Sequence, residues 1–348
     1  MSYQPPYTIS PKIILLISEI SEKLGQLSVW DKVAQLRLHR INHIRTIQGS
    51  LAIEGNTLSE TQITAILEGK TVLAPAREIQ EVRNATLAYE QLKYWQSDNE
   101  NDLLQAHQRL MTGLMDDIGR YRSGNVGVMK GKQVIHLAPP ADRISVLMND
   151  LLLWLAQTDH HPLIVSCVFH YEFEFIHPFS DGNGRMGRLW QTLILGQWNP
   201  LLAQIPVENL VFQHQQAYYN AINKSTLASD SQIFIEFILT MILQAIKETL
   251  NTQGTPQDNP QATPQVSPQV ERLLTLMQTQ EKAMNREELQ QAMGLVDRKS
   301  FRRAYLKPAL IAQLIAMTLP DKPSSSRQQY ILTQYGHHFI NNTLRVEK

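Results

Sequence analysis

Apolar residues recur every three or four positions through most of the chain, which is the period of an amphipathic α-helix. The spacing predicts helices over residues 13–24, 33–48, 60–68, 79–96 and 103–115. Ser59, with Gln62 three positions later, has the pattern of a capping box at the start of the third helix. Two more apolar stretches, 163–176 and 185–195, predict buried helices on either side of a short loop.

Strand-like sequence is scarce before the C-terminal region, with one clear exception. Residues 132–140 read KQVIHLAPP, and the Val, Ile and Leu of this stretch favour a strand that the two prolines close. The stretch therefore predicts the edge of a β-hairpin, centred on Val134, Ile135, His136 and Leu137. The protein is thus expected to be mainly α-helical.

The chain changes composition after residue 250. Residues 251–269 place Pro-Gln pairs at a regular four-residue spacing, and such a Pro, Gln and Thr stretch cannot bury a core. It predicts an extended linker, with a docking strip for a proline-binding partner as the alternative. We expect four parts: a helical N-terminal region (1–100), a core (101–250), the linker (251–269) and a C-terminal module (270–348).

The C-terminal module is predicted to hold helices at 272–278, 285–293 and 298–314, followed by strands at 315–320 and 330–333. Pro308 should kink or divide the third helix. Three helices followed by a two-stranded wing resemble a winged helix-turn-helix domain. On the predicted recognition helix, four basic residues are candidates for DNA contact: Arg298, Lys299, Arg302 and Arg303. Contact with a protein is the alternative.

Composition limits the classes of function. A length of 348 residues favours two or three domains, and 43% hydrophobic with 18% charged residues describes a globular chain with an ample core. The net charge of zero provides no general attraction for nucleic acid. The single cysteine, Cys167, cannot form an internal disulfide and lies in an apolar stretch, which favours a reducing compartment.

The expected location is the cytoplasm, without a membrane partner. The sequence contains no run of about 18 apolar residues, which is the length that a membrane-spanning helix needs. The N-terminal MSYQPPYTIS also lacks the basic and then apolar pattern of a signal peptide. Secretion by a dedicated machine is the alternative.

The chemistry is concentrated in the loop between the two predicted buried helices. Residues 177–188 read HPFSDGNGRMGR. Gly182 and Gly184 permit a close backbone approach, and the start of the following helix presents unpaired N–H groups that favour phosphate. Arg185 and Arg188 lie three apart on one helix face and can each bind phosphate oxygens. This pattern predicts a polyphosphate site.

Two other residues of this loop supply reactive groups. Asp181 is a hard oxygen ligand of the kind that Mg²⁺ uses when it also bridges to substrate phosphates. His177, with a reference pKa of about 6.5, has a neutral form that can accept a proton at pH 7. A Gly-rich turn beside a buried histidine and surface arginines is the alternative, but it does not explain all of these residues together.

The loop resembles the signature of the Fic family, His-Pro-Phe-x-(Asp/Glu)-Gly-Asn-Gly-Arg-x-x-Arg, and matches it at every defined position. The resemblance implies a Fic-type helical core with a β-hairpin flap. It also implies an enzyme that transfers AMP from ATP to a hydroxyl group of a protein, with release of pyrophosphate. ATP and Mg²⁺ are then the expected substrate and cofactor.

The resemblance also assigns roles to residues. His177 would deprotonate the target hydroxyl, and Asp181 would hold Mg²⁺. Arg185 would support the β-phosphate, and Arg188 would bind the γ-phosphate. The segment that would hold the nucleotide phosphates comprises Gly182, Asn183, Gly184, Arg185, Met186, Gly187 and Arg188.

Residues 50–56, SLAIEGN, match the inhibitory pattern of the family, (Ser/Thr)-x-x-x-Glu-(Gly/Asn). Glu54 should lie at the end of a helix that stops at Gly55, a common C-cap residue. The family implication is that Glu54 pairs with Arg188 and so competes with the γ-phosphate. The position of this motif before the core suggests the subclass with an N-terminal inhibitory helix.

Two other segments match the family. Residues 119–126, GRYRSGNV, are similar to the segment ahead of the family's flap, which binds a target peptide by adding a strand. A hairpin without a client is the alternative. Residues 215–219, QQAYY, resemble a segment near the adenine, where Tyr219 could stack on the base; a buried core tyrosine is the alternative.

Two functions from different classes follow. The first is an autoinhibited protein adenylyltransferase acting on Ser, Thr or Tyr of a protein, itself included, with removal of AMP as a reverse activity and a homodimer as a family-level expectation. The second is a DNA-binding regulator whose Fic domain senses nucleotide. A complete set of His177, Asp181, Arg185 and Arg188 favours the enzyme, although the signature specifies diphosphate handling more than the base of the nucleotide.

Overall fold

The computed structural model separates the chain into two compact units, residues 1–251 and 252–348, each taken by itself below. It describes residues 3–29, 32–125, 127–130, 133–254, 268–280, 282–295, 297, 301–311, 314–319, 325, 327–333, 336–337 and 340. No helix in these ranges has both the length and the apolar character needed to cross a bilayer.

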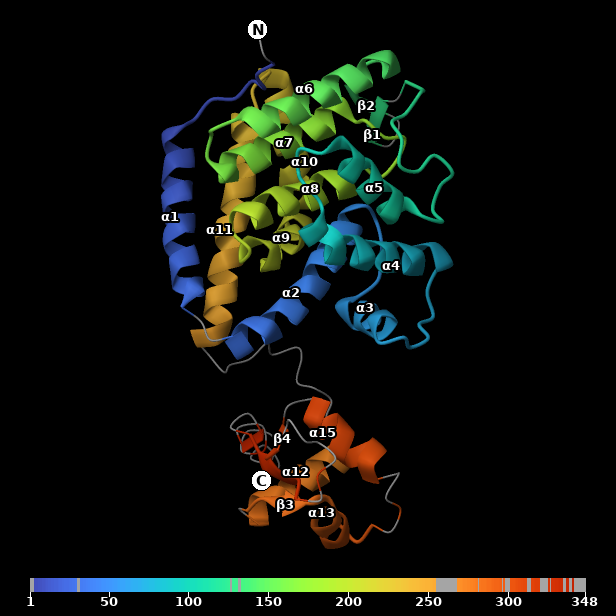
Figure 1. Cartoon of the computed structure of the whole chain (residues 1–348), viewed down its shortest axis with the longest axis vertical. Helices are drawn as coiled ribbons and strands as arrows, with labels where there is room; N and C mark the ends of the chain where they lie inside the picture. Colours follow the sequence, from blue (N-terminus) through green and yellow to red (C-terminus); the bar gives the residue numbers. More distant parts are fainter. Residues whose placement is uncertain are drawn as a thin grey trace. The chain divides into compact units, whose positions relative to one another are not determined.

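The first unit is built almost entirely of helices (Figure 1). Its helices are α1 (Pro11–Ser28), α2 (Lys32–Ile53), α3 (Glu60–Leu67), α4 (Ala76–Gln91), α5 (Glu100–Met111), α6 (Ile144–Gln157), α7 (Pro162–Ile176), α8 (Asn183–Trp198), α9 (Val207–Gln213), α10 (Gln215–Ala228) and α11 (Gln232–Gly254). Short 3₁₀ turns lie at Leu92–Tyr94, Ala141–Arg143 and Leu202–Gln204. Each of the seven helical stretches predicted in this unit lies largely inside one of these elements, and the capping box of Ser59 and Gln62 is present.

Helices α7 and α8 form the centre of the first unit (Figure 1). Almost every side chain of α7 is buried, including Cys167, and the largest fully buried side chains of the unit include Phe169 and Trp190. Burial of side chains of this size is worth roughly 1.5–3 kcal/mol each. Helices α7 and α8, which carry the motif residues and the residues before them, are therefore anchored by large buried side chains.

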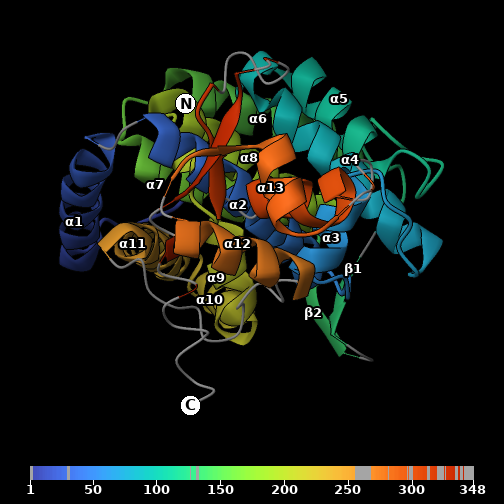
Figure 2. The same ribbon diagram turned by 90° about the horizontal axis from the view of Figure 1, so that it is seen from below.

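Helix α1 lies along α11, as both views show (Figures 1 and 2). The Ser10 hydroxyl, which caps α1, donates to Glu236 of α11 at 2.7 Å. Lys247, near the other end of α11, pairs with Glu19 at 3.1 Å. The N-terminal helix is thus part of the same unit as the core.

A two-stranded antiparallel hairpin lies between α5 and α6 in the chain. Strands β1 (Gly127–Lys130) and β2 (Gln133–Leu137) pair with Gly127 opposite Leu137, and the register shifts between Val128 and Met129. The strand predicted around residues 134–137 is therefore confirmed in its backbone. The side chains of these strands lie outside the described part of the structure.

The second unit has a core of its own around α12 (Pro268–Gln280). The other elements are β3 (Met284–Asn285), α13 (Arg286–Ala292), a π-helical turn (Arg302–Leu306), α15 (Lys307–Ile311), β4 (Ile315–Met317) and β5 (Gln329–Leu332). The strands form one antiparallel sheet in the order β3-β5-β4. Strands β4 and β5 match the two predicted strands, whereas β3 was not predicted.

The predicted long helix over 298–314 is not continuous. A π-helical turn precedes α15, and Pro308 lies at the second position of that helix, where its missing N–H is tolerated. Among the candidate DNA contacts, Arg302 is exposed. Arg298 and Lys299 and the side chain of Arg303 fall outside the described residues, and the winged-helix assignment stays a prediction.

Candidate active site

The loop between α7 and α8 is shaped by two residues with left-handed backbone. His177 ends α7 with φ 52°, and its N–H donates to the Phe173 carbonyl at 2.9 Å. Gly182 begins α8 with φ 84°, and a Cβ there would lie 2.7 Å from the Met111 sulfur. A left-handed histidine is uncommon, so surrounding contacts must hold it in place.

The first turn of α8 lies where the sequence predicts an anion site. Gly182 is the N-cap and has no side chain that could cap the first N–H groups, and no acidic residue lies in the first turn. The partial positive charge of the helix end and these amides can therefore act on a phosphate. The backbone arrangement expected for a phosphate cradle is present.

Asn183 has a structural role within the loop. Its side-chain oxygen accepts from the Phe179 N–H at 2.9 Å, and its side-chain nitrogen donates to the Phe179 carbonyl at 2.8 Å. The residue is only 2% exposed. The Asn183 side chain thus fixes the loop, and the expected contact of this residue with phosphate stays a prediction.

The His107 side chain of α5 contacts the same loop. Its ring stacks on Phe179 with centroids 3.7 Å apart, Gly119 N–H donates to Nδ1 at 3.0 Å, and Nε2 lies 3.1 Å from the Asp181 carbonyl. Because Nδ1 accepts, Nε2 carries the proton and donates to Asp181. Burial lowers the pKa of His107 to about 4.

The Asp181 carboxylate lies at the open side of the loop. Its Oδ1 accepts from the Gly182 N–H at 2.6 Å and lies 3.2 Å from Arg185 Nη2, and its Oδ2 lies 3.4 Å from Arg77 Nη2. The side chain is 48% exposed. Two arginines from different elements therefore balance its charge.

The donor set around Asp181 fits Mg²⁺ that arrives with a nucleotide. Among the described residues, no group of three or more His, Cys, Asp or Glu side chains could hold a metal ion by itself. A single exposed carboxylate is what Mg²⁺ uses when phosphate oxygens and waters supply the rest of its coordination.

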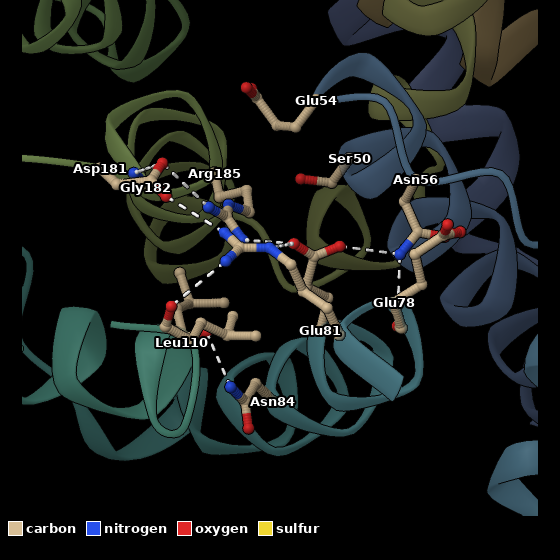
Figure 3. A network of polar contacts seen from close by, with 12 residues as sticks. Ser50, Glu54, Asn56, Glu78, Glu81, Asn84, Leu110, Asp181, Gly182 and Arg185 are labelled. Atoms are coloured by element: carbon tan, nitrogen blue, oxygen red, sulfur yellow. Dashed lines mark hydrogen bonds and ion pairs between the residues drawn. The ribbon is translucent and has the colours of Figure 1, made fainter. Parts of the chain in front are cut away.

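Arg185 forms ion pairs with two carboxylates, one on each side (Figure 3). It pairs with Asp181 at 3.2 Å and with Glu81 of α4 at 3.5 Å, and it is 5% exposed. The other oxygen of Glu81 accepts from the Asn56 side chain at 2.9 Å. Since Asn56 is the last residue of the segment 50–56 and follows Glu54 by two positions, Glu81 connects that segment to a predicted phosphate ligand.

Arg188 is paired with the inhibitory motif itself. Its Nη2 donates to Glu54 Oε1 at 2.7 Å and to the Ser50 carbonyl at 3.0 Å, and its Nε donates to the Ser50 hydroxyl at 3.2 Å. Helix α2 ends at Ile53, and Gly55 with φ 94° turns the chain so that Glu54 faces α8. The predicted pairing of Glu54 with Arg188 is present.

Charge and packing around Arg188 are tight. Burial is the largest single influence and opposes the charge on the guanidinium, but Glu54, with smaller contributions from Tyr218 and Glu174, raises the pKa of Arg188. A Cβ on Gly184 would lie 2.3 Å from Glu54 Oε1. A side chain at this position would displace the Glu54 carboxylate from its place against the start of α8.

A buried polar cluster lies beneath Arg188. His170 contacts Gln191 Oε1 at 2.7 Å through Nδ1 and the Tyr218 hydroxyl at 3.1 Å through Nε2, and burial lowers its pKa to about 3. Burial raises the pKa of Glu174 to about 7. A Cβ on Gly187 would meet His170 at 2.9 Å, so this glycine allows α8 to lie close to the cluster.

The remaining predicted nucleotide residues have structural contacts. Met186 is fully buried in the core. The Tyr219 hydroxyl lies 3.5 Å from the Ile53 carbonyl, and the Gln215 side chain donates to the same carbonyl at 2.7 Å. Helix α10 therefore holds the end of the inhibitory helix, while the expected stacking of Tyr219 on a base stays a prediction.

Two family models and a solved structure are similar to this chain. Residues 97–195 match the model of the Fic/DOC family, and residues 268–333 match that of the filamentation induced by cAMP protein Fic-like, C-terminal domain. The structure is similar to the crystal structure of a Fic family protein from Desulfovibrio desulfuricans, with 49% identity, a TM-score of 0.72, and coverage of 95% of this chain and 99% of that one. The chain belongs to the Fic family.

Curated relatives are similar over part of their length. Proteins named protein adenylyltransferase Fic from Nematostella vectensis and Aedes aegypti are each 31% identical, over 56% and 59% of this chain. The chain spans only 46% and 41% of these relatives, which is less than half of their length. The mainly α-helical Fic fold expected from the sequence is confirmed.

Four supporting residues of this Fic chain were not predicted. Arg77 and Glu81 of α4, His107 of α5 and Arg122 of the segment before the hairpin all contact the motif or its arginines. Each lies in a helix or loop whose sequence carries no pattern of its own for chemistry. The segment 119–126 was singled out by its resemblance, but not the contacts of Arg122.

Proposed function

We propose that the chain is an autoinhibited protein adenylyltransferase, which transfers AMP from ATP to a Ser, Thr or Tyr hydroxyl of a protein. The observation that carries this proposal is the 2.7 Å contact of Glu54 with Arg188 inside a complete Fic motif. The names of the curated relatives support the activity, and the start of α8 supports a polyphosphate ligand.

In the proposed reaction the target hydroxyl oxygen attacks the α-phosphorus of ATP. The bond from that phosphorus to the bridging oxygen breaks, and pyrophosphate leaves with the electron pair. His177 takes the hydroxyl proton on its imidazole. The α8 amides and Arg185 bind the phosphates, and Arg188 binds the γ-phosphate once Glu54 has left. Mg²⁺ held through Asp181 would neutralise phosphate charge.

Inhibition follows from competition for one guanidinium. While Glu54 occupies Arg188, the γ-phosphate has no partner there, and the carboxylate lies against Gly184 where it repels phosphate. A nucleotide then binds in a pose that does not align the α-phosphorus. A misplacement of about 1 Å can cost on the order of 10²-fold in rate.

The backbone of β2 supports delivery of the target. In the described part of the chain the hairpin sheet consists of β1 and β2 alone, so it offers free edges to an extended peptide. Addition of a strand uses main-chain hydrogen bonds and tolerates varied side chains.

The test compares the parent protein, Glu54→Gly and Glu54→Gly/His177→Ala in a cell lysate with ATP labelled on the α-phosphate or on the γ-phosphate. We expect labelling above that of lysate alone from the α-label only, because the kinases of the lysate use the γ-label in every sample. This labelling should rise in Glu54→Gly and be lost in the double variant. γ-Labelling that rises above the lysate background with Glu54→Gly would mean phosphoryl transfer, and equal α-labelling in the parent and Glu54→Gly would refute the inhibitory role.

Removal of AMP is a second proposed activity of the same residues. A water placed by Glu54 would attack the phosphorus of the modified side chain, the bond from that phosphorus to the side-chain oxygen would break, and that oxygen would leave with the electron pair and take up a proton. The test mixes Glu54→Gly protein that already carries AMP with the parent protein. If the form that contains Glu54 removes AMP, the parent should release AMP from this substrate.

A further inference from the structure

Arg122 is buried and bonded almost wholly to main-chain carbonyls. It is 4% exposed, and it lies in the segment that leads from α5 to β1. Its side chain donates to the carbonyls of His177 at 2.7 Å, Gly124 at 2.8 Å, Pro139 at 2.7 Å and Ile176 at 3.4 Å. Burial lowers the pKa of the Arg122 guanidinium.

On one side Arg122 holds the catalytic loop at three consecutive residues. Besides its contacts with the carbonyls of Ile176 and His177, its own N–H donates to the Pro178 carbonyl at 2.9 Å. His177 has left-handed backbone with φ 52°, an uncommon conformation for a residue with a side chain. Arg122 therefore fixes the backbone that aims the His177 imidazole.

On the other side Arg122 holds both ends of the hairpin. Gly124 lies before β1, and Pro139 lies after β2. A second contact closes the same pair of ends, because the Asn125 side chain accepts from the Ala141 N–H at 2.9 Å. The base of the hairpin is thus fastened to one guanidinium.

We propose that Arg122 is a positioning residue that sets the distance between the peptide-binding hairpin and the His177 imidazole. This inference rests on the proposed function. A target peptide on β2 delivers its hydroxyl correctly only if β2 and His177 keep one relative position. A planar guanidinium with a rigid set of donors can join both groups at once, whereas an ammonium on a flexible chain cannot.

The test variant is Arg122→Lys in the Glu54→Gly background, with Arg120→Lys as the matched control. Arg120 lies two residues earlier and is 67% exposed, with Asp117 as its ion-pair partner. Two products from α-labelled ATP are measured: AMP attached to protein in a lysate, and AMP released to water without lysate. Hydrogen exchange of the 127–137 amides is measured on the same proteins.

We expect Arg122→Lys to lower the ratio of attached to released AMP by about 10-fold or more, since a shift near 1 Å can cost on the order of 10². Exchange over residues 127–137 should rise, and Arg120→Lys should change neither. If Arg122→Lys does not fold, Asn125→Ala, which removes the second contact, should give the same changes at smaller size.

An unchanged ratio with unchanged exchange would overturn the inference. So would an equal loss of both products together with a lower unfolding temperature, which is the result of a purely structural role. If Glu54→Gly with Arg122 intact attaches no AMP to protein, the proposed function fails. Exchange over residues 127–137 still decides whether Arg122 holds the hairpin.

Discussion

Glu54 and Arg188 lie 134 positions apart in the sequence, and their side chains meet at 2.7 Å. The carboxylate comes from the turn after α2, and the guanidinium from the first turns of α8. Arg188 is 2% exposed, whereas the Glu54 side chain is 37% exposed. The partner that must move is therefore the one that already reaches solvent.

This asymmetry predicts a selective change in nucleotide affinity. ADP lacks the γ-phosphate that Arg188 would bind, so removal of Glu54 should favour ATP over ADP. A hydrogen bond to a charged group is worth about 1.5–3 kcal/mol. In a His177→Ala background, which prevents turnover, Glu54→Gly should raise the ATP-to-ADP affinity ratio by roughly 10-fold or more.

Isothermal titration calorimetry with both nucleotides checks this prediction. Glu54→Gln should give a smaller rise, because it keeps the bulk beside Gly184 and loses the charge. Glu22→Gln, at an exposed position of α1, is the control. An unchanged ratio in Glu54→Gly would show that the carboxylate does not compete with the γ-phosphate.

The contact of Glu54 with Gly184 predicts a coupling that needs no activity measurement. A Cβ at Gly184 would lie 2.3 Å from Glu54 Oε1, which is the far end of a flexible side chain, so in Gly184→Ala the Glu54 carboxylate should shift away from Arg188. Loss of that contact should lower the free energy of unfolding by about 1 kcal/mol. In the Glu54→Gly background the same substitution should cost much less. Denaturant unfolding of the four proteins measures the coupling, and additive effects would contradict it.

The helices and the motif could be predicted from the sequence because each depends on residues that lie close together in the chain. Apolar periodicity located the helices, and cap residues located the capping box at Ser59 and the turn at Gly55. The motif residues 177–188 identified the loop. The pairing of Glu54 with Arg188 was predicted only through the family resemblance, since no local pattern joins positions so far apart.

The missing parts depend on tertiary contacts. Glu81 belongs to an ordinary charged helix face, and only the tertiary packing of α4 against α5 and α2 brings it to Arg185. The Asn183 side chain closes the loop on Phe179, a contact that the sequence did not predict, while the phosphate contact of this residue stays a prediction. Strand β3 is two residues long and has no period to detect.

Glu81 should restrain Arg185 as Glu54 restrains Arg188. Its Oε1 lies 3.5 Å from both Arg185 and Arg77, so Glu81→Gln removes a negative charge beside two cations. Because an electropositive site attracts polyphosphate, ATP affinity should rise severalfold. Glu78→Gln is the matched control, since Glu78 lies on the same helix and accepts from Thr57. Calorimetric titration measures both, and equal affinities would exclude a restraint by Glu81.

His107 should make stability depend on pH. Burial lowers its pKa from 6.5 to about 4, so the unfolded chain takes up a proton before the folded one does. The stability that neutral His107 contributes is complete above about pH 6.5 and is lost as the pH falls towards 4. Since one pKa unit corresponds to 1.36 kcal/mol, the loss should reach about 3 kcal/mol.

Replacement of His107 removes this titration. In His107→Gln the free energy of unfolding should fall less steeply between pH 6.5 and 4 than in the parent. An NMR titration gives an independent value, because the His107 ring should titrate near pH 4. A His107 that titrates near 6.5 would mean that its ring is not buried against Phe179 in solution, which would contradict this prediction.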